Sequence, residues 1–237
     1  MRTKTTLLCA AILAAGALSS MAQSNVFSLN VVGYINTTLT GPGYSMIANQ
    51  LDSGNNVFSN FFQGLPSGSQ VIKWNTNTAA FVIASRTLIG NGWSPAAAAT
   101  TTLNPGEACF VKLAGASRTN TFVGNVMSLA ATGGTNPVYS ATYTNSLVTG
   151  YTLMGSSFPI TGPIASAAAG LEITNIPTGS QVIKWNPLTQ AYQTFTKTAV
   201  GTGWNPSVAN GPTINVGEGF FLKAASPFTS VQTFNVN

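Results

Sequence analysis

The sequence predicts a mainly β protein with two tandem β-sandwich-like repeats, each containing a short helix. The first observation behind this prediction is an internal repeat: LPSGSQVIKWN at 65–75 returns as IPTGSQVIKWN at 176–186, 111 positions later, with nine of eleven residues identical. Self-similarity of this length predicts that one structural unit occurs twice. Further pairs of segments support it, namely GNGWSP at 90–95 with GTGWNP at 201–206, NPGEACFVKLA at 104–114 with NVGEGFFLKAA at 215–225, and GYSMIANQ at 43–50 with GYTLMGSS at 150–157.

The second observation is the alternation of side chains within QVIKWN. Ile72 and Trp74 fall on one face of an extended segment, and Val71 and Lys73 fall on the other, which is the pattern of a half-buried strand. We expect the tryptophan to point into the sandwich core and the lysine to point to solvent. The next segments, AAFVIAS and QAYQTFT, follow after short turns and are predicted to pair with QVIKWN as hairpins.

The remaining elements are taken in chain order. Residues 24–40 form a long β-type run, and the stretches 55–66 and 163–171 each predict a short helix because their apolar residues recur at helical spacing. The turns NPGE and NVGE precede strands rich in β-branched and aromatic residues. The polar stretch 130–147 is interpreted as a linker, which leaves the N-terminal run without an obvious partner. The two predicted units are 23–128 and 129–237.

The first 22 residues have the pattern of a secretory signal peptide. Arg2 and Lys4 precede an apolar run at 7–18, and small residues lead to a cleavage site after Ala22. The run has 12 residues, short of the roughly 20 needed to cross a bilayer. We therefore expect a mature chain that is secreted or held at the cell surface, with no membrane insertion after cleavage.

Charge is scarce in the mature chain, which keeps seven Lys or Arg and four Asp or Glu. The basic residues are scattered singly, whereas a nucleic-acid-binding protein gathers them in a patch or stripe, so nucleic acid is not expected as a partner. Cys109 is the one cysteine left after cleavage, which excludes an intramolecular disulfide. It aligns with Phe220 of the second repeat, and this predicts a buried apolar position rather than a reactive thiol.

The residue inventory argues against catalysis. The chain has no histidine, which removes Ser-His-Asp triads and most zinc sites. Among the acids, Glu107 and Glu218 occupy equivalent positions at the start of the same strand in each repeat. We expect them to accept backbone N–H groups or to pair with a lysine of their own repeat, rather than to act as a glycosidase pair. No catalytic residue, metal site or cofactor is predicted.

Aromatic residues supply the candidate binding sites. Trp93 and Trp204 each lie in a Gly-x-Gly-Trp-x-Pro segment, where glycine and proline predict a surface loop. Such a tryptophan can stack on a sugar ring, and two copies would bind a polysaccharide bivalently; it can also close the end of a sandwich. Tyr44 and Tyr151, at the starts of equivalent strands, leave the same two alternatives open.

The order NVVGYINTTL, GYSMIANQL, SQVIKWN, GWSP and LNPGEACFVK resembles a group of secreted β-rich repeat proteins from bacteria of the Verrucomicrobia and Planctomycetes kind. The shorter pattern GYSMIAN, VIKWN and PGEACFV is also similar to small β-sandwich modules near the ends of bacterial secreted and adhesive proteins. The resemblance covers nearly all of the mature chain. It implies secretion and a tandem β-sandwich, and it implies no catalytic residues.

Together these observations predict a secreted, non-catalytic protein with a structural or adhesive role at the cell surface or in the extracellular matrix. Its expected partners are other copies of itself, joined through sheet edges, or a surface polysaccharide. The run at 24–40 either inserts into the sheet of a neighbouring subunit or pairs within its own chain as an edge strand. The alternative function is carbohydrate binding through Trp93 and Trp204.

Overall fold

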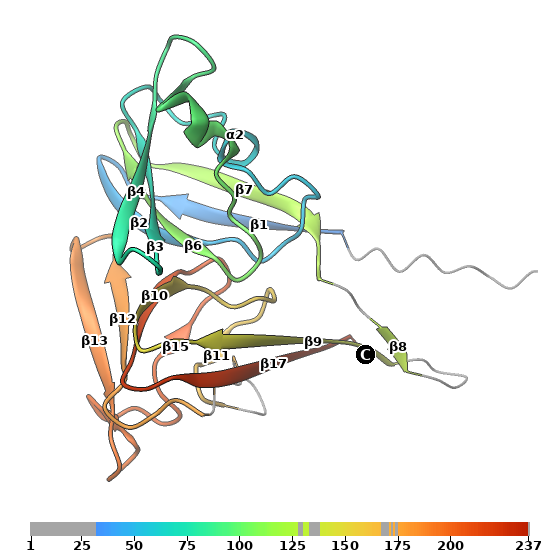
Figure 1. Ribbon diagram of the computed structural model, residues 1–237, viewed down its shortest axis with the longest axis vertical. Coiled ribbons are helices and arrows are strands. Elements are labelled where there is room, and N and C mark those ends of the chain that lie inside the picture. The colour runs from blue at the N-terminus through green and yellow to red at the C-terminus, as the bar shows by residue number, and fades with distance from the viewer. Residues whose placement is uncertain are drawn as a thin grey trace, which may run out of the picture. The chain divides into compact units, whose positions relative to one another are not determined.

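The computed structural model describes residues 32–127, 130–132, 138–166, 171, 173 and 175–236. The fold is mainly β with several antiparallel sheets, as the sequence predicts (Figure 1). The predicted signal peptide at 1–22 lies outside the described residues. The described residues belong to one compact unit. No helix in the described part of the chain is long and apolar enough to cross a membrane.

Two five-stranded sheets have the same strand order (Figure 1). The first consists, in order, of β2 (Gly43–Ala48), β6 (Ala108–Leu113), β3 (Gln70–Asn75), β4 (Ala80–Arg86) and β5 (Trp93–Ser94). The second consists of β10 (Gly150–Met154), β16 (Phe220–Ala224), β12 (Gln181–Asn186), β13 (Ala191–Lys197) and β14 (Trp204–Asn205). The antiparallel pairing of β3 with β4 and of β12 with β13 confirms both predicted hairpins.

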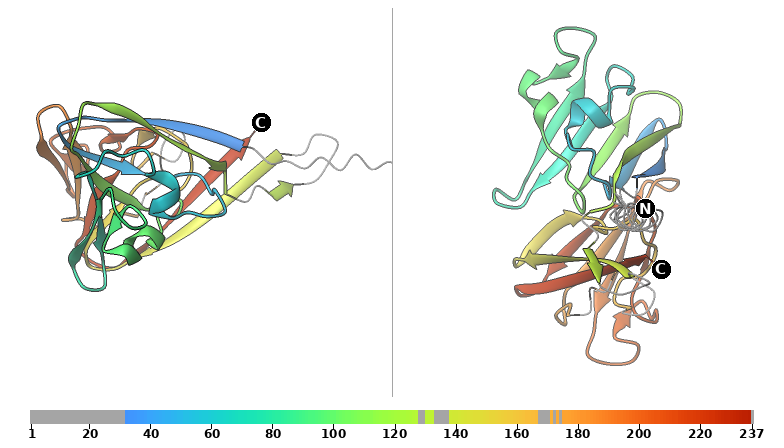
Figure 2. Two further views of the ribbon diagram at one scale, coloured as in Figure 1. Left: turned by 90° about the horizontal axis from the view of Figure 1, so that it is seen from above. Right: turned by 90° about the vertical axis from the view of Figure 1, so that its right-hand side faces the viewer.

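In each repeat, the segments that flank the five-stranded sheet pair with each other. β1 (Val32–Leu39) pairs along its whole length with β7 (Arg118–Asn125), and β9 (Val138–Leu147) pairs with β17 (Phe228–Val236). Figure 2 shows these two ribbons as neighbouring arrows, blue with green and yellow with red. The short strand β8 (Ala130–Thr132) extends the second ribbon, and β11 (Gly162–Pro163) pairs with β15 (Thr213–Ile214).

The ribbons correct two interpretations of the sequence. Residues 130–147 are not a linker, because β8 and β9 occupy most of this stretch. Their Thr-, Ser- and Asn-rich sequence has little apolar alternation, and the strand is specified by its long pairing with β17. At the N-terminus, β1 has β7 as a partner in its own chain, so residues 32–39 are not an unpaired strand for donation. Residues 24–31 lie outside the described part of the chain.

The helical segments are short. α2 (Phe58–Phe61) is the helix predicted for the first repeat, and it buries Phe58 and Phe61. A 3-10 turn, η2 (Ala96–Thr100), follows β5. The helix predicted at 163–171 is absent from the described part of that stretch, where Pro163 belongs to β11 and a turn follows. Residues 167–170 lie outside the described residues.

One face of each five-stranded sheet packs on the flanking ribbon of the same repeat. In the first repeat, Val71 and Val111 of the sheet share a buried core with Leu39 and Phe122 of the ribbon. The second repeat has an equivalent core around Val182 and Leu222 of its sheet and Leu147 of its ribbon. This arrangement of a sheet on a ribbon is the sandwich-like feature of each repeat.

The opposite faces of the two sheets pack on each other, and we call this contact the seam. Its core consists of Met46, Ala48, Ala108, Phe110, Leu153 and Phe221, with Tyr44, Ile72, Trp74, Ile183 and Trp185 packed against it. The predicted orientation of the repeated strand is therefore wrong. Trp74 faces the other repeat, and Lys73 lies on the side of the sandwich core, where it meets Glu107. Because both faces of β3 are covered, alternation alone could not identify the face that belongs to the sandwich.

Candidate functional site: an aromatic groove at the seam

Two reciprocal hydrogen bonds connect the repeats at the seam. The indole Nε1–H of Trp74 donates to the backbone carbonyl of Tyr151 at 2.8 Å, and that of Trp185 donates to the carbonyl of Tyr44, also at 2.8 Å. Trp74 is equivalent to Trp185, and Tyr44 is equivalent to Tyr151, in the two copies of the repeated sequence. Each repeat thus donates one indole N–H to a backbone carbonyl of the other repeat.

Two backbone hydrogen bonds across the seam are reciprocal in the same way. The N–H of Ala48 donates to the carbonyl of Gly217 at 2.9 Å, and the N–H of Gly155 donates to the carbonyl of Gly106 at 3.0 Å. These four residues again form two equivalent pairs. The close approach depends on a small residue, because a Cβ on Gly155 would lie 2.2 Å from the Cβ of Ala48.

Eight aromatic side chains form a continuous cluster across the seam. Each repeat contributes four: Tyr44, Trp74, Phe81 and Phe110 from the first, and Tyr151, Trp185, Tyr192 and Phe221 from the second. Phe110 and Phe221 meet each other at 6.2 Å between ring centroids. Most of the contacts are edge-to-face, which is a favourable geometry for aromatic pairs.

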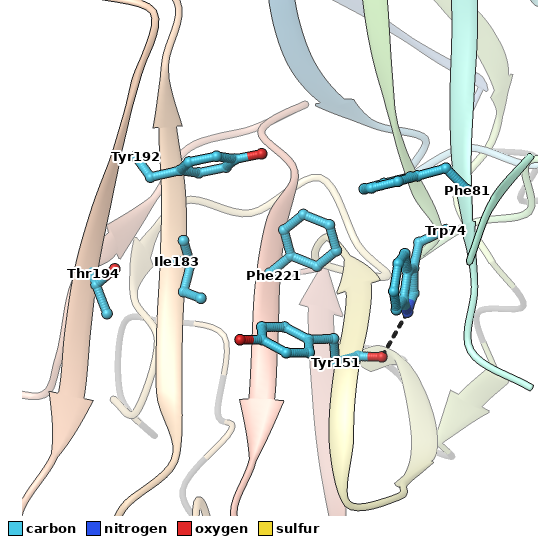
Figure 3. A pocket seen from close by; sticks show the side chains of 7 residues that line it. All are labelled: Trp74, Phe81, Tyr151, Ile183, Tyr192, Thr194 and Phe221. Atoms are coloured by element: carbon cyan, nitrogen blue, oxygen red, sulfur yellow. Dashed lines mark hydrogen bonds between the residues drawn. The ribbon is translucent and has the colours of Figure 1, made fainter. Parts of the chain in front are cut away.

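A groove of about 370 Å³ opens over this cluster. Figure 3 shows the side chains that line it, with Phe221 at its centre. Phe221 is buried, whereas Phe81 is 47% exposed, Tyr192 is 55% exposed and Tyr151 is 40% exposed. The full lining is Trp74, Phe81, Tyr151, Ile183, Tyr192, Thr194 and Phe221. Residues of both repeats therefore form the groove, and its surface is mostly apolar.

Polar groups border the groove. The ammonium of Lys223 lies over the ring of Tyr151, 5.2 Å from its centroid. Partial burial raises the pKa of the Tyr192 hydroxyl above its usual value, so this hydroxyl stays neutral at physiological pH and can both donate and accept. A second hollow of about 430 Å³ shares Trp74 with the groove, and its lining includes Lys73, Asn75 and Glu107.

The two tryptophans proposed as exposed ligand-stacking residues are buried instead. Trp93 is 4% exposed and Trp204 is 3% exposed, which leaves neither ring a free face for a sugar. A cation lies over each ring: the guanidinium of Arg86 is 4.9 Å from the centroid of Trp93, and the ammonium of Lys197 is 5.3 Å from that of Trp204. These tryptophans close the ends of the sandwich cores, which was the other alternative left open by the sequence.

The two predicted tyrosines differ in their surroundings. Tyr151 lines the groove. Tyr44 occupies the equivalent place on the other side of the seam, where the side chain of Gln190 covers its backbone. The structure therefore brings one of the four predicted site residues into the groove.

Glu107 and Glu218 each bind a lysine and a backbone N–H of their own repeat, as the sequence predicts. Glu107 accepts from Lys73 at 2.8 Å and from the backbone N–H of Asn104 at 2.6 Å. Glu218 pairs with Lys184 at 3.0 Å and accepts from the N–H of Asn215 at 2.9 Å. A further acid, at position 172, lies outside the described residues.

Cys109 is fully buried in the core of the first repeat, as predicted. Burial raises the pKa of its thiol, because a thiolate in an apolar core would lose its hydration. Cys109 is therefore an apolar packing residue of this core.

Most of the groove residues were not predicted as site residues. Phe81 and Tyr192 are hairpin residues whose strands were predicted correctly, but no sequence pattern indicates that the two hairpins meet. The one available signal was the aromatic residue present at both equivalent positions, 81 and 192, on the same face of each strand as the repeated tryptophan.

Comparison of this chain with protein-family models, with curated proteins and with solved structures found no match.

Proposed function

We propose that the mature chain is a secreted, non-catalytic adhesive protein that binds an extracellular ligand in the groove at the seam. The observation that carries the proposal is the concentration of partly exposed aromatic rings, Phe81, Tyr151 and Tyr192, around one opening. Contiguous exposed apolar surface of this kind is kept at binding sites, and the volume falls within the range of small-ligand sites.

The chemistry of the groove favours binding over catalysis. Its lining consists of aromatic, aliphatic and hydroxyl side chains, with no carboxylate, thiol or amine among these residues. Glu107, which lines the adjoining hollow, is engaged by Lys73 and a backbone N–H. Aromatic faces beside amide and hydroxyl groups are suited to sugars, which present an apolar ring face and polar edges. A surface polysaccharide is accordingly the ligand class in this proposal.

The test is affinity electrophoresis of the mature chain through gels that contain soluble polysaccharides. Phe81→Ala and Tyr192→Ala should each abolish the retardation produced by a bound polysaccharide, because each removes an exposed ring from the groove. Tyr34→Ala is the matched control, since Tyr34 is an aromatic residue, 74% exposed, on the flanking strand β1. Retardation that is unchanged by both groove variants would contradict the proposal.

A second candidate function, self-assembly through sheet edges, is favoured by the outer edge of β4. Strand β5 pairs only with Ser85 and Arg86 of β4, so residues Ala80–Ala84 have β3 alone as a described neighbour. Phe81, Val82 and Ile83 are between 43% and 47% exposed there. Natural proteins usually protect an apolar, uncharged edge with lysine or proline, and this edge has neither.

Light scattering on the mature chain tests this candidate. Val82→Lys places a charge on the edge, and it should reduce any oligomer to the monomer mass if copies associate through β4. Gln193→Lys is the control at the equivalent position of β13. A wild-type chain that stays monomeric across a wide concentration range would rule out assembly of this chain alone.

A further inference from the structure

Lys223 lies on the face of the second sheet that carries the groove. Side chains two positions apart on a strand point to the same side, so Lys223 shares this face of β16 with Phe221, which lines the groove. In the antiparallel register, Lys223 is directly opposite Tyr151 of β10, and its ammonium is 5.2 Å from the centroid of the tyrosine ring. An exposed cation therefore borders the groove beside one of its lining residues.

Around Lys223, a polar row of side chains runs across the sheet beside an apolar row. The polar row consists of Tyr151, Lys223, Gln181 and Thr196, which are paired across neighbouring strands. The apolar row, two positions along each strand, includes Phe221, Ile183 and Thr194 of the groove lining. Two strand positions span roughly 7 Å, so a sugar ring against the apolar row would have its substituents beside the polar row.

The charge of Lys223 is not neutralised by a carboxylate in the described part of the chain. The ion pairs found there join a lysine to a glutamate within each repeat, Lys73 to Glu107 and Lys184 to Glu218. Residues 23–237 contain seven Lys or Arg and four Asp or Glu, so five cations and two acids remain outside these pairs. An excess of positive charge attracts anionic ligands, and Lys223 places part of that excess beside the groove.

We infer that the ligand of the groove is an acidic polysaccharide, an inference that rests on the groove being a ligand site. A sugar ring would lie against the exposed rings of Phe81 and Tyr192, and the carboxylate or sulfate of the polysaccharide would pair with the ammonium of Lys223. The amide of Gln181 and the hydroxyl of Thr196 add donors along the same row. The groove lining contains no carboxylate, so none of its side chains repels such an anion.

The first repeat supplies a matched control for Lys223. Lys112 is its equivalent in the repeated sequence. It is also exposed, and its ammonium lies 5.6 Å from the ring centroid of Tyr44. The groove lining includes Tyr151 and not Tyr44. Replacing Lys112 therefore changes the net charge as replacing Lys223 does, but beside a tyrosine outside the groove.

The first measurement is affinity electrophoresis of the mature chain through gels that contain polygalacturonate, alginate or sulfated carrageenan. Neutral gels contain hydroxyethylcellulose or the methyl esters of the two carboxylated polymers. At least one acidic gel should retard the protein more than every neutral gel does. Esterification keeps the sugar chain and removes its charge, so loss of retardation in the ester gel isolates the anion. The carboxylated and sulfated gels distinguish the two sources of that anion.

The second measurement compares variants in the acidic gel that retards the protein most. Lys223→Gln should weaken binding about three- to fivefold, the contribution of an exposed ion pair, and Lys223→Arg should retain most of the affinity. Lys112→Gln should leave the affinity nearly unchanged, although it has the same net charge as Lys223→Gln. Added salt should weaken binding of the wild type more than that of Lys223→Gln. Thermal unfolding midpoints check that the variants remain folded.

Three results would overturn the inference: no retardation in any acidic gel, equal retardation by an acidic polymer and its ester, or equal losses in Lys223→Gln and Lys112→Gln. If Phe81→Ala and Tyr192→Ala still abolished retardation by a neutral polysaccharide, the proposed function would stand without the acidic ligand. Binding of an acidic polymer that survives both of these groove variants would overturn the inference and the proposed function together.

Discussion

Ala48 and Gly155 occupy equivalent positions in the two repeats, and they meet each other across the seam. A Cβ on Gly155 would lie 2.2 Å from the Cβ of Ala48, in a region where both backbones are joined to the opposite repeat by hydrogen bonds. The seam therefore accommodates one methyl group at this contact and has no room for a second.

The first prediction concerns this contact. Gly155→Ala should destabilise the protein by about 1–3 kcal/mol, because the seam must shift to accommodate the added methyl group. Adding Ala48→Gly moves the methyl group from one repeat to the other and should recover most of that loss. Urea unfolding of the two single variants and the double variant measures the coupling. A double variant whose loss equals the sum of the two single losses would show that the residues do not share one space.

The second prediction concerns the reciprocal indole bonds. Trp74→Phe and Trp185→Phe keep an aromatic ring and remove the donor to Tyr151 and Tyr44, so each should cost about 1 kcal/mol of unfolding free energy. The loss should be larger for Trp185, whose bond is partly buried, than for Trp74, whose bond is exposed. Chemical denaturation measures both values, and the opposite order would contradict this assignment.

The third prediction concerns Glu218, which bridges Lys184 and the backbone N–H of Asn215 with both side chains of the ion pair 18% exposed. Glu218→Gln loses the charge and one acceptor, and it should reduce stability by about 1 kcal/mol. Glu107→Gln should reduce it less, because the Glu107 side chain is 37% exposed. Thermal unfolding at low and high salt separates the ionic part of the effect, and the absence of any loss in Glu218→Gln would exclude a structural role for the bridge.

The fourth prediction concerns Cys109. Because burial raises the pKa of its thiol, the thiolate fraction in the folded protein at neutral pH is negligible, and the side chain is also inaccessible. An aromatic disulfide reagent should therefore react with the unfolded mature chain and not with the folded one. Rapid labelling of the folded protein would mean that the core of the first repeat opens on the timescale of the reagent.

The sequence was sufficient for the β class and for the hairpins, because QVIKWN and the segment after it have the composition and turn spacing of paired strands. The sequence was insufficient where pairing with another strand, rather than a pattern of apolar residues, specifies a strand. β9 has few large apolar residues, and its ten residues form a strand by pairing with β17. The sandwich-closing role of Trp93 was also ambiguous, since glycine and proline around it predict a loop but do not reveal whether its ring turns inward.

The groove could not be predicted from one repeat at a time. Phe81 and Tyr192 come from hairpins 111 positions apart, and they line one opening because the seam joins the two sheets. The two sides of the seam also differ at one exposed turn position, where Gln190 covers the backbone of Tyr44 and the first repeat has Ala79. Turn positions of this kind belong to no hydrophobic pattern, so their role at the seam cannot be predicted from the sequence alone.

The most direct test of the central claim is a titration followed through the indole N–H signals in the nitrogen–proton correlation spectrum of the mature chain. The protein has four tryptophans, and a soluble polysaccharide bound in the groove should shift the signal of Trp74, which lines the groove. The signals of the buried Trp93 and Trp204 should stay in place. Shifts at Trp93 and Trp204 with none at Trp74 would contradict the account and return the binding site to the two loops.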